Sequence, residues 1–248
     1  MLIRLGDARD HRLDRRLAFT LAAVAGAVNA AAFHAVGFFS ANMTGNVSSL
    51  SSLLALSQWK HGLGYLTVVL TFIAGATIST LLIDTGLRRG VVSIYARVVL
   101  GEAILLAAAG LGRSMLDSAN GVPLLILGLS FLMGLQNAIV THISDARVRT
   151  THISGMSTDI GIGVARLIAI RRGKSDSAEG GAVATRLKLH AGTVFCFFAG
   201  GVLGVLAYGW IGDLSFGLAA IPLAAVAGAA LLSPPKGAGG ADRLVDET

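Results

Sequence analysis

The chain has 248 residues, of which 54% are hydrophobic and only 14% are charged, whereas about a quarter of the residues in a typical soluble domain carry a charge. This composition excludes a disordered chain, which needs low hydrophobicity and high charge. It also argues against a soluble enzyme, because the apolar residues come in blocks of about twenty, the length of a membrane span. A single cysteine, Cys196, excludes a disulfide framework and a multi-cysteine metal site. We therefore predict an all-α membrane protein without a metal or cofactor.

Six segments are apolar enough to cross the membrane, since a spanning helix needs about 20 apolar residues. The first segment follows Arg15 and Arg16 and resembles a secretory signal, but it continues far beyond the apparent cleavage site, so we expect it in the mature protein. The last is the shortest and contains Pro222, which neighbouring helices can accommodate. The six predicted spans are Leu17–Phe39, His61–Ile83, Ser93–Gly112, Val122–Ile143, Leu189–Ile211 and Phe216–Leu232.

The positive charges are distributed unevenly between these segments. Eighteen of the 20 lysines and arginines lie before the first segment, in the second and fourth loop regions and in the C-terminal tail. Since cytoplasmic loops are enriched in lysine and arginine, both termini are expected in the cytoplasm, and the number of spans is even. The basic loops favour contact with anionic lipids at the cytoplasmic face. They do not favour nucleic acid, because no basic stripe alternates with exposed aromatic residues.

Three short matches relate the two halves of the chain. The matches occur in the same order in both halves. The number of residues between the two members of a pair increases along the chain, and we assign this increase to the polar insertion 171–188. They pair residues 26–30 (GAVNA) with 134–138 (GLQNA), 42–46 (NMTGN) with 152–156 (HISGM), and 72–75 (FIAG) with 197–200 (FFAG).

These matches predict a duplicated three-helix unit, with one copy in residues 17–112 and the other in 122–232. Because three is an odd number, the second copy starts on the opposite side of the membrane, and the units are inverted repeats of the kind found in many transporters. We expect a basic cytoplasmic N-terminus, residues 1–16, and a flexible cytoplasmic tail, residues 233–248, to flank the two units.

A polar motif follows the first predicted span at residues 40–49, and another follows the fourth at 150–159. Each precedes a short apolar stretch, 47–58 or 160–170. At 1.5 Å per residue these stretches reach about 18 and 16 Å, too short to span. They are therefore predicted to be half-helices.

Two interpretations of the polar motifs are open. In one, the motifs only cap the half-helices, through Thr44 or Asn46 in the first and Ser157 or Thr158 in the second, with turns at Gly45 and Gly155. In the other, the half-helices also enter from opposite faces, and their N-termini meet near the midplane and line a solute path. Irregular backbone at that depth is tolerated only where protein buries it or water reaches it.

Three motifs carry a resemblance to a known family: residues 38–46 (FFSANMTGN), 133–138 (MGLQNA) and 149–155 (RTTHISG). In these motifs the chain resembles the YoaK-type family of bacterial six-helix membrane proteins, a domain of unknown function. The resemblance implies a multi-pass protein of the bacterial inner membrane and no established reaction or substrate. The family often has aspartate where this chain has Asn29, and Thr-Gly where it has Ser154-Gly155. If that aspartate handles cations or protons, Asn29 puts the role in doubt here.

Glu102 lies in the middle of the third predicted span, where a lipid-exposed carboxylate costs about 2.5 kcal/mol or more. It is either a neutral carboxyl bonded to Asn29, Asn137 or Gln136, or a group that couples protons or cations to transport. Asn29 and Asn137 occupy matched positions and either join helices or contact solute.

Two further groups of polar residues favour structural over catalytic roles. Asp159 and Arg166 share a helix face, so a surface ion pair is expected at the cytoplasmic interface. The histidines show no metal-ligand spacing, and the sequence around Ser130 lacks the second glycine of a nucleophile elbow.

The function that this pattern favours is a small-solute permease or channel-like transporter of unknown substrate, and not an enzyme. The alternative is a non-transporting membrane scaffold or regulatory protein, and the sequence permits a homo-oligomer in either case. The predicted coupling residue is Glu102. The predicted solute-path residues are Asn29, Asn42, Thr44, Gly45, Asn46, Asn137, His152, Ser154, Gly155, Ser157 and Asp159.

Overall fold

The computed structural model describes residues 11–113, 118–144, 150–173 and 177–232 of the chain. Within these ranges every regular element is a helix, and seven of the helices are long and apolar enough to cross a membrane. The elements are α1 (His11–Val36), α2 (Met43–Ala55), α3 (Trp59–Arg88), α4 (Ile94–Arg113), α5 (Ser118–Ser144), α6 (Ile153–Arg171), a short 3₁₀ turn (Ser177–Glu179), α7 (Gly180–Ile211) and α8 (Leu214–Leu232).

Each of the six predicted spans coincides with one of the helices α1, α3, α4, α5, α7 and α8. The helices α3 and α7 have 30 and 32 residues and extend beyond the predicted spans, and α1 both begins and ends earlier than predicted. At 1.5 Å per residue α3 and α7 are about 45 and 48 Å long, more than the roughly 30 Å of hydrocarbon that a span must cross. Because α7 begins at Gly180, the later part of the predicted polar insertion is helical.

The two short helices begin earlier than predicted. In both, the polar motif forms the first turns of the helix instead of preceding it. The 13 residues of α2 reach about 20 Å, too short to span, as predicted. The 19 residues of α6 reach about 28 Å, and α6 meets the length and composition criterion for a span. The prediction that this segment is too short was therefore wrong.

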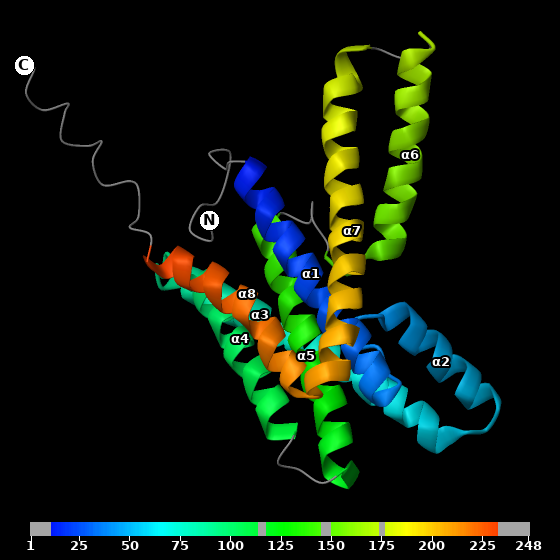
Figure 1. Ribbon diagram of the computed structural model, residues 1–248, viewed down its shortest axis with the longest axis vertical. Helices are drawn as coiled ribbons and strands as arrows, with labels where there is room; N and C mark the ends of the chain where they lie inside the picture. The colour runs from blue at the N-terminus through cyan, green and yellow to red at the C-terminus, as the bar shows by residue number, and fades with distance from the viewer. Residues whose placement is uncertain (1–10, 114–117, 145–149, 174–176, 233–248) are drawn as a thin grey trace, which may run out of the picture.

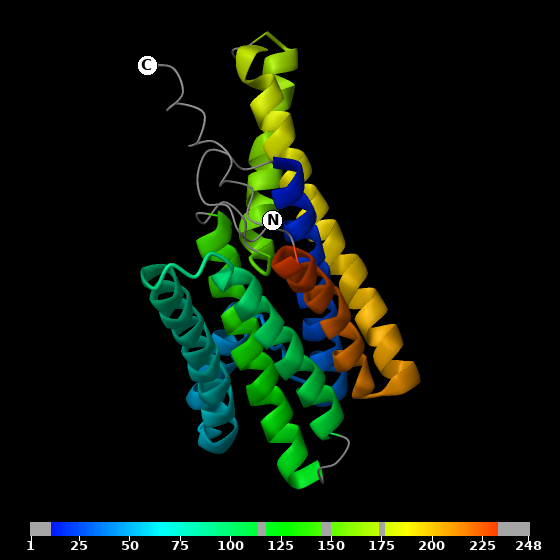
Figure 2. The same ribbon diagram turned by 90° about the vertical axis from the view of Figure 1, so that its left-hand side faces the viewer.

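The helices pack in pairs drawn from the two halves of the chain. The main pairs are α1 with α7, α3 with α5, and α4 with α8, while α2 folds back on α3 and α6 on α7. Figures 1 and 2 show that α1 and α5 run in opposite directions along the long axis of the molecule. The same views show that α6 and the first half of α7 form a hairpin that extends beyond the other helices.

Glycines bring the backbones of two of these pairs into contact. A Cβ atom on Gly26 of α1 would overlap the carbonyl of Phe197 in α7, and one on Gly134 of α5 would overlap the carbonyl of Phe72 in α3. Helices in lipid gain little from apolar burial and associate through such close packing at small residues. The two glycines therefore allow the two crossings.

The buried core lies mainly between α1, α4, α5 and α8. By contrast, only 6% of the most apolar stretch of α6 and 11% of that of α7 is buried within the protein. Large apolar side chains such as Phe195, Phe198 and Trp210 lie on the outer face of α7. An apolar outer surface of this extent is typical of helices that face lipid.

The glycine contact in α5 generates a stability prediction. We expect Gly134→Ala to lower the midpoint of thermal unfolding in detergent by several degrees, because overpacking of a close contact costs about 1–3 kcal/mol. Gly128→Ala on the same helix is the control, since a Cβ there meets nothing within 4 Å. It should leave the midpoint unchanged or raise it. Equal midpoints for the two variants would contradict the packing described.

Candidate functional site

A cavity of about 640 Å³ lies where the N-termini of α2 and α6 come together. Its walls come from both halves of the chain, including α1, α3, α5 and α7 in addition to the two short helices. None of the lining residues is aspartate, glutamate, lysine or arginine. They are Asn29, Ala41, Asn42, Met43, Thr44, Phe72, Asn137, Thr141, Thr151, His152, Ile153, Ser154 and Phe197.

The lining residues are related by the matches between the two halves of the sequence. Five pairs lie within the matched segments, and the register of the second match, extended by one residue, pairs Ala41 with Thr151. All lining residues except Thr141 belong to these pairs. The five pairs within the matches are Asn29 with Asn137, Asn42 with His152, Met43 with Ile153, Thr44 with Ser154, and Phe72 with Phe197.

Two asparagines fix the positions at which the short helices begin. Asn29 is 7% exposed, and its Oδ1 accepts a hydrogen bond of 2.8 Å from the backbone N–H of Ala41. Asn137 accepts a hydrogen bond of 2.6 Å from the Thr151 hydroxyl and donates one of 2.7 Å from Nδ2 to the carbonyl of Met133. Each asparagine thus holds the chain two residues before a short helix starts, which ties α2 to α1 and α6 to α5.

The capping residues differ from those predicted. The side chain of Asn42 caps α2 by accepting a hydrogen bond of 3.1 Å from the N–H of Gly45. His152 occupies the corresponding position before α6, and its side chain makes no capping hydrogen bond. Thr44 and Asn46 lie inside α2. Ser157 and Thr158 lie inside α6.

Gly45 and Gly155 are helical and do not form the turns that were predicted for them. They leave space for the preceding cap residue. A Cβ on Gly45 would lie 2.6 Å from Nδ2 of Asn42, and one on Gly155 would lie 2.8 Å from Nδ1 of His152. The side chains of Asn42 and His152 can therefore fold over the first turn of their helices.

Some predicted path residues line the cavity and others do not. Gly45, Asn46, Gly155, Ser157 and Asp159 lie outside the lining. Asn46 is buried and donates a hydrogen bond of 3.0 Å from Nδ2 to the carbonyl of Phe39, so it anchors the loop before α2. The predicted residues that line it are Asn29, Asn42, Thr44, Asn137, His152 and Ser154.

The lining residues that sequence reasoning did not assign to the path are Ala41, Met43, Phe72, Thr141, Thr151, Ile153 and Phe197. Phe72 and Phe197 lie in the third match between the halves, and this pairing is the signal that could have identified them.

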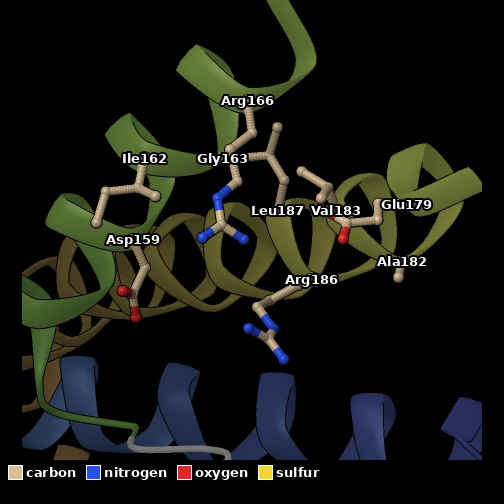
Figure 3. A pocket seen from close by; sticks show the side chains of 9 residues that line it. All are labelled: Asp159, Ile162, Gly163, Arg166, Glu179, Ala182, Val183, Arg186 and Leu187. Carbon is tan, nitrogen blue, oxygen red and sulfur yellow. The ribbon is translucent and has the colours of Figure 1, made fainter. Parts of the chain in front are cut away.

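Asp159 lies in a second cavity, of about 520 Å³, between α6 and α7. Figure 3 shows the guanidinium group of Arg166 directed from α6 toward α7, whereas that of Arg186 is directed away from α6. The expected ion pair of Asp159 with Arg166 does not form. Oδ2 of Asp159 instead lies 3.7 Å from Nδ1 of His190, a contact that is an ion pair only when the imidazole is protonated. Since Glu179 also lines this cavity, two acids balance two arginines, and the cavity has no net charge to attract a solute.

Glu102 is fully buried in α4 and does not line the cavity between α2 and α6. Neither of its carboxyl oxygens has a hydrogen-bond partner among the described residues, and the amide of Gln136 is also buried without one. The expected hydrogen bonds from Glu102 to Asn29, Asn137 or Gln136 are therefore not formed. Within the described ranges, no three His, Cys, Asp or Glu side chains gather to hold a metal ion.

The cap of α2 can be tested against the uncapped α6. We expect Asn42→Ala to lower the midpoint of thermal unfolding by a few degrees, because loss of an N-cap costs about 1 kcal/mol. Asn42→Ser should retain most of the stability, since serine can also accept the hydrogen bond from Gly45. His152→Ala is the matched control and should not lower the midpoint through capping, because His152 makes no capping bond. Equal losses in Asn42→Ala and His152→Ala would contradict this assignment.

Replacement of the buried carboxyl of Glu102 is expected to stabilise the protein. We expect Glu102→Met to raise the midpoint of thermal unfolding, because a buried polar group without a partner costs about 1–3 kcal/mol and methionine removes that cost. Glu179→Met is the control, because Glu179 is exposed and exposed substitutions change stability by no more than about 0.5 kcal/mol. A marked fall for Glu102→Met alone would mean that the carboxyl has a stabilising partner in the membrane.

Comparison with known proteins identifies a family and no individual relative. A family model described as "Protein of unknown function (DUF1275)" matches residues 17–229, so the chain belongs to this family. This assignment agrees with the resemblance to the YoaK-type family. No curated protein and no solved structure matches the chain.

Proposed function

We propose that this member of the DUF1275 family is a small-solute permease or channel-like protein of the bacterial inner membrane. In this proposal two inverted units place their half-helices, α2 and α6, end to end, and the solute passes through the cavity between them. The single observation that carries the proposal is the lining of that cavity, which takes matched polar residues from both halves of the chain. Solute sites of transporters with inverted repeats are built from such broken helices.

The helix crossings support the inverted repeat. Gly26 contacts Phe197 in one crossing, and the matched residues Gly134 and Phe72 make the same contact in the other. Helices α1 and α5, which carry the two glycines, run in opposite directions (Figures 1 and 2). A twofold relation between units of opposite orientation would produce both observations.

The length of α7 supports a half-helix role for α6, although α6 is long enough to span. Gly163 of α6 packs on Leu187 of α7, and Leu187 lies about 36 Å along α7 from its end at Ile211. If Ile211 marks the outer boundary of a hydrocarbon layer about 30 Å thick, Leu187 lies at or beyond the cytoplasmic boundary. Only the first turns of α6 are then within the hydrocarbon. This placement retains six spans and puts both termini in the cytoplasm.

The basic residues of the α6–α7 hairpin fit this orientation. Arg166, Arg171, Arg172, Arg186 and Lys188 all lie in the part of the hairpin that would extend into or beyond the cytoplasmic head groups. Cytoplasmic segments next to a membrane are enriched in such residues, which attract anionic lipids.

The chemistry of the cavity favours solute passage over the alternative of a scaffold or regulatory protein. A purely structural contact between helices in lipid would be closed and would pair its polar groups, because unsatisfied polar groups there are costly. Here Thr44 and Ser154 line a cavity instead of being closed between helices. The scaffold alternative requires that this cavity stay closed to water.

Thiol labelling tests the solute path. In a Cys196→Ala background, we expect cysteine at Thr44 or Ser154 to react with a small water-soluble thiol reagent, because both positions line the cavity. Cysteine at Thr77 should not react, because that exposed position is in the middle of α3 and faces lipid. Cysteine at Thr185, an exposed position near the start of α7 in the part that would project into the cytoplasm, is the positive control.

Reaction at Thr44 and Ser154 should also reduce solute flux in reconstituted vesicles, since the attached group fills the cavity. If Thr185→Cys reacts while Thr44→Cys and Ser154→Cys are protected from both sides of the membrane, the solute path is refuted and the scaffold alternative is favoured.

A further inference from the structure

We infer that the cavity between α2 and α6 selects a small anion. This inference rests on the proposed function and goes beyond it by naming the substrate class. Three kinds of group around the cavity lead to it: free N–H groups at two helix N-termini, the side-chain NH₂ of Asn29, and hydroxyls that are free to donate.

The first group is the pair of helix N-termini. In α6 the first backbone hydrogen bond runs from the N–H of Met156 to the carbonyl of His152, and no side chain caps the helix. The N–H groups of Ile153, Ser154 and Gly155 therefore have no partner among the described residues. In α2, Asn42 caps only the N–H of Gly45. Helix N-termini carry partial positive charge, and their free N–H groups bind anions.

The second group is the side chain of Asn29, which lines the cavity and is more than nine-tenths buried. Because the backbone N–H of Ala41 can only donate, the atom of Asn29 that accepts its hydrogen bond is the oxygen. The group that Asn29 offers to a ligand is therefore the Nδ2 donor, and no acceptor for Nδ2 lies in the part of the chain that the structure describes. Asn137 differs, because its Nδ2 donates to Met133 within α5.

The third group consists of the hydroxyls of Thr44 and Ser154, which make no side-chain hydrogen bond to any described residue. Both lie in the first turns of the short helices and line the cavity. The lining contains no carboxylate, and its one titratable side chain is His152, which carries positive charge when protonated. A cation would lack a counter-charge here and would face two positive helix ends, whereas an anion would receive several donors.

The test uses purified full-length protein in lipid vesicles and swelling in isosmotic solutions. In potassium nitrate, formate or chloride with valinomycin present, vesicles swell only if the anion enters with potassium. In glycerol or urea, they swell only if a neutral solute enters. We expect protein-dependent swelling in one or more of the three salts, and none in glycerol, in urea or in potassium gluconate, whose anion is too large.

Two substitutions test whether the cavity sets this selectivity. Ser154→Asp should reduce anion-dependent swelling about tenfold or more, because a carboxylate on the cavity wall would repel an anion within a few ångströms. Ser154→Asn has nearly the same shape without the charge and should retain most of the rate. Asn29→Asp keeps an acceptor for Ala41 and replaces the free donor with a negative oxygen, so it should also reduce the rate. Size-exclusion profiles would confirm that each variant is folded.

The outcomes separate this inference from the proposed function. Swelling in glycerol or urea but in no salt would overturn the anion inference and leave solute passage intact. Anion flux that is equal in Ser154→Asp, Asn29→Asp and Ser154→Asn would overturn it as well. An absence of swelling in every solution, with cavity cysteines protected from reagent, would refute the proposed function itself.

Discussion

The contact of a glycine with a backbone carbonyl in each of two helix crossings is the constraint on which the cavity depends. Gly26 and Gly134 lie against the carbonyls of Phe197 and Phe72, and the same two phenylalanines line the cavity. The distance between the paired helices therefore sets the position of the cavity wall. In lipid, where apolar burial does little to hold helices together, close packing of this kind supplies much of the attraction.

The asparagine that follows each glycine by three residues extends this constraint to the short helices. Residues three apart lie on neighbouring positions of a helix surface, so Asn29 and Asn137 are close to the crossings. Their hydrogen bonds hold the chain at Ala41 and Thr151, just before α2 and α6 begin. One short segment of α1 and one of α5 thus determine both how the spans pack and where the helix N-termini face the cavity.

The features that could be predicted from the sequence are those that depend on long or repeated patterns. The six apolar blocks predicted helices because the thickness of the hydrocarbon imposes a minimum length on any span. The repeat predicted that Asn29, Asn137, Thr44 and Ser154 would face a common space, and they line one cavity.

The features that could not be predicted depend on local geometry. The first turn of a helix accepts polar residues because its N–H groups need partners. The polar residues 154–159 were therefore interpreted as a segment before α6, although they form its first turns. Phe72 was missed because an apolar residue in an apolar helix carries no chemical signal of its own. The burial of Glu102 without a partner depends on which face of α4 meets its neighbours, and a lone span does not reveal that face.

The hairpin of α6 and α7 has a mechanical consequence. Ser154 at the cavity and Arg171 at the far end belong to one uninterrupted helix, and α7 runs from that same far end back to Phe197 at the cavity. Two walls of the cavity are therefore rigidly connected to the part of the hairpin that projects away from the bundle. If the projecting end of the hairpin tilts, the cavity ends of α6 and α7 move with it and the width of the cavity changes.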